Sequence, residues 1–255
     1  MMLFAINALV VLFLAAPIIV VIATAFTTTN YPLFPPVGFT FRWFQAFLDS
    51  ADFTDGMRRS AILAFTSTII STCLGTLSAL ALARWHGRTQ QALAVLMLSP
   101  ILFPTIVLGL ALLVFYSRVG LSGTFIGLVI AHSVVTTPFV VRLVMASLTE
   151  FDPSVEEAAR NLGAGWWRTF FQITLPIIRP GVLAGAVFAF ILSFDELVIT
   201  LFLAGPGMAT LPICIFTFVE YSSTPIISAI ATTLIAAWML IGVPIYVRFL
   251  SIRHA

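Results

Sequence analysis

Two adjacent acids, Asp195 and Glu196, interrupt the otherwise apolar stretch ILSFDELVITLF. Neighbouring carboxylates can attract a cationic solute, contribute ligands to a metal ion, or act together as acid and base. A charge at the centre of a bilayer costs at least ~2.5 kcal/mol, so an acidic pair inside a membrane needs either a function or a charged partner. The segments around the pair therefore decide which chemistry is open to it.

The composition predicts a membrane protein. Of the 255 residues, 60% are hydrophobic and 9% are charged, whereas a soluble domain carries about 25% charged residues. The net charge of +2 comes with scattered arginines, which argues against a nucleic-acid-binding surface. The sequence contains no lysine, and this excludes both a Walker A phosphate loop and a Schiff-base enzyme.

Six apolar segments are long enough to cross a bilayer, since a membrane helix needs about 20 residues. We therefore expect an all-α, polytopic protein that forms one membrane domain over residues 1–255. The expected spans are 2–25, 61–85, 92–116, 124–148, 181–203 and 224–250. Pro100 and Pro104 predict a kink or a broken start in the third span. The acidic pair falls in the fifth span, about 21 Å from its start at ~1.5 Å per residue, at or beyond the bilayer midplane.

Two interpretations of the acidic pair are open at this point. In the first, the pair faces a translocation cavity and meets cationic groups of a substrate. In the second, it is neutralised or salt-bridged and holds helices together, for instance through an arginine of a second membrane subunit. No His or Cys accompanies the pair in its span, which disfavours a membrane enzyme or a metal site. His132 in the fourth span either lines a pathway or is a satisfied core histidine near a kink at Pro138.

The arginines indicate how the spans are oriented. With the N-terminus inside, one side of the membrane holds eight of the arginines and the other side holds four. The larger set is Arg84, Arg88, Arg142, Arg160, Arg168, Arg179, Arg248 and Arg253. Under the positive-inside rule, this bias places both termini in the cytoplasm, together with the loop of about residues 150–180 between the fourth and fifth spans.

That loop begins with the pattern of a short helix. Asp152 suits the N-cap and Pro153 the first helical position. Glu156 and Glu157 follow in the early turns, where the helix dipole favours negative charge. Gly163 stands where a left-handed C-cap is expected.

A second short helix is expected after this glycine. The segment Trp166–Thr174 is aromatic, and Pro176 is expected to end it. Two short helices joined at a glycine would lie on the membrane face. From these residues alone, the loop is either an amphipathic segment that rests on lipid or a docking surface for a partner.

The spacing of residues in the loop resembles a known motif. Glu157-Ala158-Ala159, three residues, Gly163, nine residues, Ile173, one residue and Leu175-Pro176 are similar to the EAA loop of the membrane subunits of binding-protein-dependent ABC importers. In this family the loop forms a coupling helix that sits in a cleft of the ATP-hydrolysing subunit. The resemblance implies that Glu157 makes the polar contact to the ATPase. It also implies that Ala158 and Ala159 allow close approach and that Gly163 supplies the turn.

The resemblance further implies what this chain does not do by itself. It has no catalytic residue and is not an enzyme, because ATP and Mg would be bound by a partner subunit. The expected partners are a second homologous permease subunit, two copies of a cytoplasmic ATP-binding subunit and an external solute-binding protein. The expected location is the inner membrane of a bacterium, in contact with lipid, and no nucleic acid is involved.

The segments around the acidic pair resemble the polyamine branch of these permeases. The stretches SFDELVITLFLAGPG, TLPICIFTFVEY and TPIISAIATTLI are similar in pattern to the second permease subunit of spermidine/putrescine importers. This implies that Asp195 and Glu196 line the pathway of a polyamine, because carboxylates can replace the hydration shell of its ammonium groups. The alternatives are a permease for another small solute, with a structural acidic pair, or an ion- or proton-coupled carrier.

Overall fold

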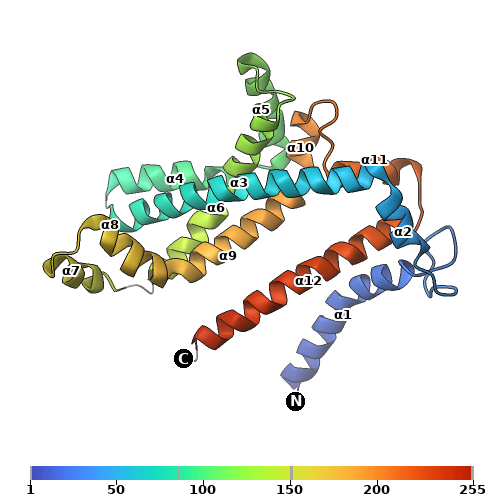
Figure 1. Cartoon of the computed structure of the whole chain (residues 1–255), viewed down its shortest axis with the longest axis horizontal. Coiled ribbons are helices and arrows are strands. Elements are labelled where there is room, and N and C mark those ends of the chain that lie inside the picture. The colour runs from blue at the N-terminus through green and yellow to red at the C-terminus, as the bar shows by residue number, and fades with distance from the viewer. Residues whose placement is uncertain (1, 86, 150–151, 254–255) are drawn as a thin grey trace. The chain divides into compact units, whose positions relative to one another are not determined.

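The structure, a computed structural model, describes residues 2–85, 87–149 and 152–253, and at residues 2, 241 and 243–253 it describes the backbone alone. The described residues contain helices and no strand (Figure 1). The elements are α1 (Met2–Thr24), α2 (Arg42–Asp49), α3 (Ala51–Arg84), α4 (Arg88–Leu102), α5 (Thr105–Val119), α6 (Phe125–Thr149), α7 (Ser154–Asn161), α8 (Trp166–Thr169), the π-helical segment η1 (Phe170–Thr174), α9 (Leu175–Phe194), α10 (Val198–Leu203), α11 (Leu211–Tyr221) and α12 (Ile226–Arg253). The predicted all-α class is confirmed.

Four helical segments of the described chain are long and apolar enough to cross a membrane, and a bent pair of helices makes a fifth. The four are Leu3–Thr24, Ala51–Arg84, Phe125–Thr149 and Trp166–Phe194. The expected sixth span falls on α12, whose part with described side chains, Ile226–Leu240, is a shorter apolar helix. Six spans therefore stay a prediction, as does the cytoplasmic side of Arg248 and Arg253, whose side chains lie outside the described residues.

The bent pair is the third expected span. Helices α4 and α5 meet at an angle of 106° across Phe103 and Pro104 (Figure 1). Proline has no N–H to continue the ladder and disfavours helical geometry in the residue before it. Phe103 accordingly has an extended conformation, with φ −94° and ψ 139°. The break predicted from the prolines is confirmed.

The chain divides into two compact units, which are described separately. One consists of Met1–Asp55 and Cys214–Ala255, the other of Gly56–Ile213. In the first, α1 packs along α12, and the Thr24 hydroxyl donates to Ser228 Oγ at 3.1 Å. Aromatic rings follow α1, with Phe26 stacked on Phe39 at 4.8 Å between centroids. A single domain over residues 1–255 stays a prediction.

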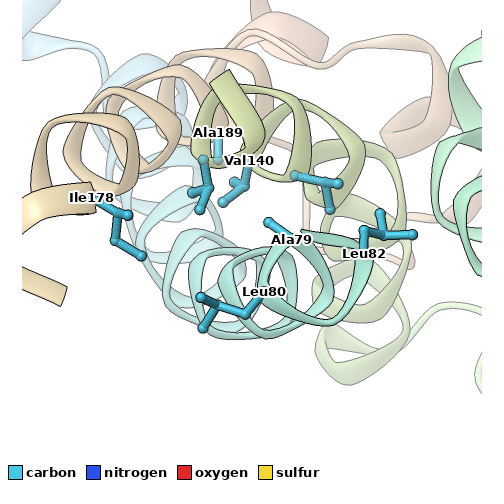
Figure 2. Close-up of a cluster of buried hydrophobic side chains, with 8 residues drawn as sticks. Ala79, Leu80, Leu82, Val140, Ile178 and Ala189 are labelled. Atoms are coloured by element: carbon cyan, nitrogen blue, oxygen red, sulfur yellow. The ribbon is translucent and has the colours of Figure 1, made fainter. Parts of the chain in front are cut away.

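The second unit is built on α3, α6 and α9. A buried apolar cluster joins the three helices (Figure 2), with Ala79, Leu80 and Leu82 from α3, Val140 from α6, and Ile178 and Ala189 from α9. Helices in membranes approach closely where small residues meet. Gly181 of α9 illustrates this, because a Cβ at that position would collide with the Ser147 side chain of α6.

The two ends of this unit carry different features. At one end the last turn of α3 lies beside the α7 loop, as the contact between Arg84 and Glu156 shows. At the other end α10 packs on α5, and the Gly123 N–H donates to the Leu203 carbonyl at 3.1 Å. Helix α9 runs between these ends and, at ~1.5 Å per residue, is about 30 Å long.

Candidate functional site

The α7 loop begins with a capped helix. The Asp152 carboxylate accepts a hydrogen bond from the Ser154 N–H at 2.9 Å, and this bond lowers the pKa of Asp152. Pro153 already has helical dihedral angles, φ −61° and ψ −20°, and α7 proper starts at Ser154. The Asp152 carboxylate thus binds an N–H of the first turn as expected, but α7 begins one residue later than predicted, with Pro153 at its N-cap position. Residues 150 and 151 of the predicted loop lie outside the described residues.

The end of α7 is a left-handed glycine turn. Gly163 has φ +87°. Its N–H donates to the Arg160 carbonyl at 2.9 Å, and the Ala164 N–H donates to the Ala159 carbonyl at 3.0 Å. These two bonds form a Schellman motif, which satisfies the last carbonyls of the helix. The left-handed C-cap predicted at Gly163 is confirmed.

Replacing Gly163 by alanine is expected to loosen this turn, while the same change at Gly165 is not. A side chain at either position would meet no atom within 4 Å, so only the backbone distinguishes them. Gly163 has φ +87° whereas Gly165 has φ −68°, and an L-residue in the left-handed region costs about 1 kcal/mol. Amide hydrogen exchange over residues 158–164 should be about fivefold faster in the Gly163→Ala protein. Equal exchange in both variants would show that the left-handed turn does not hold the loop.

The motif residues Glu157, Ala158 and Ala159 of α7, together with Gly163 just after it, form an open surface, called the α7 surface below. Glu157 and Ala158 are exposed, Ala159 is half-buried and Gly163 is exposed. Within the described residues, the Glu157 carboxylate has no hydrogen-bond or ion-pair partner. The surface is therefore accessible to a partner, and the contact between Glu157 and an ATPase subunit stays a prediction.

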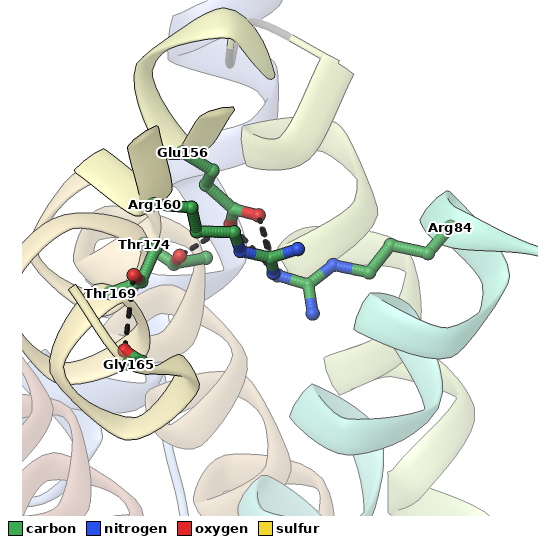
Figure 3. A network of polar contacts seen from close by, with 6 residues as sticks. All are labelled: Arg84, Glu156, Arg160, Gly165, Thr169 and Thr174. Carbon is green, nitrogen blue, oxygen red and sulfur yellow. Dashed lines mark hydrogen bonds and ion pairs between the residues drawn. The ribbon is translucent and has the colours of Figure 1, made fainter. Parts of the chain in front are cut away.

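Glu156, the residue before the motif, has a role that the sequence did not reveal. It is the buried residue of α7, with 9% of its surface exposed. Arg84 Nη2 donates to both of its carboxylate oxygens, at 2.8 and 3.0 Å, and Thr174 Oγ1 donates to Oε1 (Figure 3). Arg160 lies 3.8 Å away on the same helix. The sequence indicated only that Glu156 interacts with the helix dipole. No local sequence pattern indicates a contact between residues 72 positions apart.

The aromatic segment after the glycine runs into the next helix without a break. The expectation that Pro176 ends it is wrong, since α8, η1 and α9 follow one another directly. The Leu175 N–H bonds the Phe170 carbonyl five residues back, and this wide π-turn tolerates a proline in the first turn of α9. Trp167 stacks on Phe171 at 6.0 Å, and both rings are exposed.

The acidic pair does not lie in a continuous helix, contrary to the prediction. Helix α9 ends at Phe194 and α10 begins at Val198, so Asp195 and Glu196 stand in a break. Glu196 Oε1 accepts the Ile199 N–H at 2.9 Å, and the Thr200 hydroxyl donates to the Glu196 carbonyl at 2.9 Å. A carboxylate that captures free N–H groups favours the start of a new helix over continuation of the old one.

The two acids at the break have different surroundings. Asp195 is exposed, and its carboxylate has no hydrogen-bond or ion-pair partner within the described part of the chain. Glu196 is half-buried and occupied as the cap of α10. Asp195 is thus the acid that remains available to a ligand.

His132 holds the two sides of the break together. It is 1% exposed, with Nδ1 at 2.8 Å from Ser193 Oγ and Nε2 at 3.0 Å from Thr200 Oγ1. Because the Thr200 hydroxyl donates to the Glu196 carbonyl, it accepts from Nε2, which therefore carries a proton. His132 is a satisfied core histidine, which was the second of its two interpretations.

The candidate residues form two separate groups. The α7 surface and the acidic break lie at opposite ends of α9, about 30 Å apart. No group of three metal-ligating side chains occurs among the residues that the structure describes. The arrangement offers a surface for a partner at one end and a carboxylate for a cation at the other.

Comparison with known sequences gives consistent matches. The family described as "Binding-protein-dependent transport system inner membrane component" matches residues 71–253. The spermidine/putrescine transport system permease protein PotC of Escherichia coli (strain K12) is 31% identical over 223 residues, which cover 88% of this chain and 84% of that protein. The putrescine transport system permease protein PotI of the same strain is 31% identical over 237 residues, covering 90% and 84%.

Two further comparisons bear on substrate and fold. PhnV of Salmonella typhimurium (strain LT2), whose name refers to 2-aminoethylphosphonate transport, is 27% identical over 92% of this chain and 89% of its own length. The crystal structure of a bacterial ABC transporter involved in the import of the acidic polysaccharide alginate matches with a TM-score of 0.70. The match covers 99% of this chain and 96% of that one at 15% identity. This last likeness concerns the fold alone.

Proposed function

Since the chain belongs to the family of inner membrane components of binding-protein-dependent transport systems, we propose that it forms half of the translocation pathway for a small cation. The cation is a polyamine, putrescine or spermidine. The chain is a transport subunit and not an enzyme. A separate ATPase subunit, which binds ATP and Mg, powers the movement.

The observation that carries the proposal is the exposed carboxylate of Asp195, which has no hydrogen-bond or ion-pair partner among the described residues. It stands at a helix break next to otherwise apolar helices, where an acid without a partner is costly. A polyamine carries several ammonium groups that lose water on entering such surroundings, and a carboxylate can replace that water. The names of PotC and PotI, which refer to spermidine and putrescine transport, support the same substrate class.

The α7 surface is proposed to dock into the ATPase. Glu157 supplies a charge, Ala158 and Ala159 leave room for close approach, and the Gly163 turn fixes how α7 is presented. The complex contains a second homologous permease, two copies of the ATPase and an external solute-binding protein. The arginine bias supports a cytoplasmic position for this loop and both termini, in the inner membrane of a bacterium.

Transport is proposed to follow alternating access. The solute-binding protein delivers the cation to the outer side, and ATP draws the two ATPase subunits together. Their movement displaces α7, the central cavity opens outward, and hydrolysis resets it inward. Such coupling requires a two-state element that ATP and substrate both bias; α7 is the ATP-responsive end and Asp195 the substrate-responsive end.

Two other functions are alternatives to this one. A permease for a different small solute is favoured by the similarity to PhnV, and in that case Asp195 would be structural. An ion- or proton-coupled carrier would leave the exposed motif residues of α7 without a purpose. The first alternative also depends on an ATPase subunit, whereas the second works without one.

ATP hydrolysis by the reassembled transporter in lipid nanodiscs tests the coupled mechanism. We expect the solute-binding protein loaded with spermidine to raise the hydrolysis rate severalfold above that of the ATPase subunit alone. A carrier that works without an ATPase would show no such stimulation. If a binding protein loaded with another solute stimulated hydrolysis and the spermidine-loaded protein did not, the polyamine assignment would be wrong. The assignment to an ATP-driven transporter would still hold.

A further inference from the structure

We propose that Glu156 is a positioning residue that transmits movement of α7 to two other helices, α3 and α9. The link consists of Glu156, Arg84 and Thr174, and is called the Glu156 network below. The inference rests on the proposed coupling role of α7. It adds a residue outside the motif and a physical route from the docking surface into the membrane helices.

The burial of α7 is the first argument. Glu156 is its buried residue, while Val155, Glu157 and Ala158 beside it are exposed. Helix α7 also contacts α8 and η1, but Glu156 is the one residue of α7 that is buried. A displacement of the exposed face of α7 would therefore move the Glu156 carboxylate and its partners with it.

The Arg84 contact is the second argument. Arg84 lies in the last turn of α3, and its guanidinium donates to both oxygens of Glu156 at 2.8 and 3.0 Å. The Glu156 side chain is 11% exposed and that of Arg84 is 35% exposed. Arg160 stays within 3.8 Å of Glu156 on α7 itself, so Arg84 is the ion-pair partner that comes from another helix. Separating a partly buried ion pair costs free energy, and the pair therefore resists movement of α7 away from the end of α3.

The Thr174 contact completes the route. Thr174 is the last residue of the π-helical segment η1, directly before α9, and its hydroxyl donates to Glu156 Oε1 (Figure 3). Single π-turns inside helices are frequent at functional sites. Displacement of Glu156 would bear on this turn, and α9 connects the turn to the acidic break at its far end.

The test measures cations transported per ATP hydrolysed in the complete transporter. Arg84→Gln and Glu156→Gln are each expected to lower this ratio about tenfold while the ATPase subunit still co-purifies at the wild-type level. The double variant should be no worse than either single one, because both remove the same link. Arg88→Gln is the matched control, since Arg88 is an exposed arginine at the start of the next helix and makes no contact with Glu156; its ratio should equal that of wild type.

Thr174→Val keeps the shape and the ion pair and removes one donor, so it provides a milder variant should the charge changes impair folding. We expect the ratio to fall about threefold. An unchanged ratio in Glu156→Gln and Thr174→Val would overturn the proposal, and so would equal losses in Arg84→Gln and Arg88→Gln. Loss of the ATPase subunit from Glu156→Gln would assign Glu156 to docking and overturn its role as a link. If Glu157→Ala retained both ATPase binding and coupled uptake, the proposed docking role of the α7 surface would be wrong, whatever the result for Glu156.

Discussion

Substituting alanine for Glu157 is expected to release the ATPase subunit and to abolish ATP-driven uptake, while the protein stays inserted in the membrane. Glu157 is exposed and has no side-chain partner within the described residues, so the chain itself loses no contact. A hydrogen bond to a charged group at an interface contributes about 1.5–3 kcal/mol. Binding of the ATPase should therefore weaken by about ten- to a hundredfold, measured by titration of the ATPase subunit against the permease pair in nanodiscs.

Glu220→Ala is the matched control for this change. Glu220 is also an exposed glutamate, but it lies in α11 and outside the motif. Its removal should leave ATPase binding unchanged. Equal weakening in both variants would indicate a loss of general negative charge, and wild-type binding by Glu157→Ala would refute the docking role of α7.

The second large effect is expected at the acidic break, where the two acids should behave differently. Asp195→Asn removes the exposed carboxylate and should lower uptake of spermidine about tenfold or more, since a charged hydrogen bond to the substrate worth about 1.5–3 kcal/mol is lost. Glu196→Gln should transport within about twofold of wild type. The reason is that the glutamine oxygen can still accept the Ile199 N–H that Glu196 accepts now.

Uptake at several spermidine concentrations separates these roles. For Asp195→Asn we expect the loss mainly as a higher KM, because a site for the substrate is weakened. Glu196→Ala, which removes the cap, should reduce the amount of inserted protein instead. Normal uptake by Asp195→Asn would assign that acid to structure, and a larger loss in Glu196→Gln than in Asp195→Asn would reverse the assignment.

Local signals in the sequence predicted much of the helical layout. Apolar runs located α1, α3 and α6, and Pro104 predicted the break between α4 and α5 because a proline acts on its own neighbours. The Gly163 turn was predictable for the same reason, since a left-handed position favours glycine whatever surrounds it. These features depend on a few adjacent residues.

Other features depend on contacts that no local pattern encodes. The break at Asp195 contains neither glycine nor proline, and it is stabilised by the Glu196 cap and by His132 from another helix. The apolar run around the pair therefore predicted a continuous helix. The π-turn that accommodates Pro176 and the pairing of Arg84 with Glu156 were missed for the same reason. Each depends on how α3, α7 and α9 pack together.

The most direct test of the central claim is uptake of radiolabelled spermidine by proteoliposomes that contain this chain, its partner permease, the ATPase and the loaded binding protein. We expect ATP-dependent accumulation of spermidine, none with a non-hydrolysable ATP analogue, and no uptake of labelled 2-aminoethylphosphonate under the same conditions. ATP-dependent uptake of 2-aminoethylphosphonate with no uptake of spermidine or putrescine would contradict the assignment of this permease to a cationic polyamine.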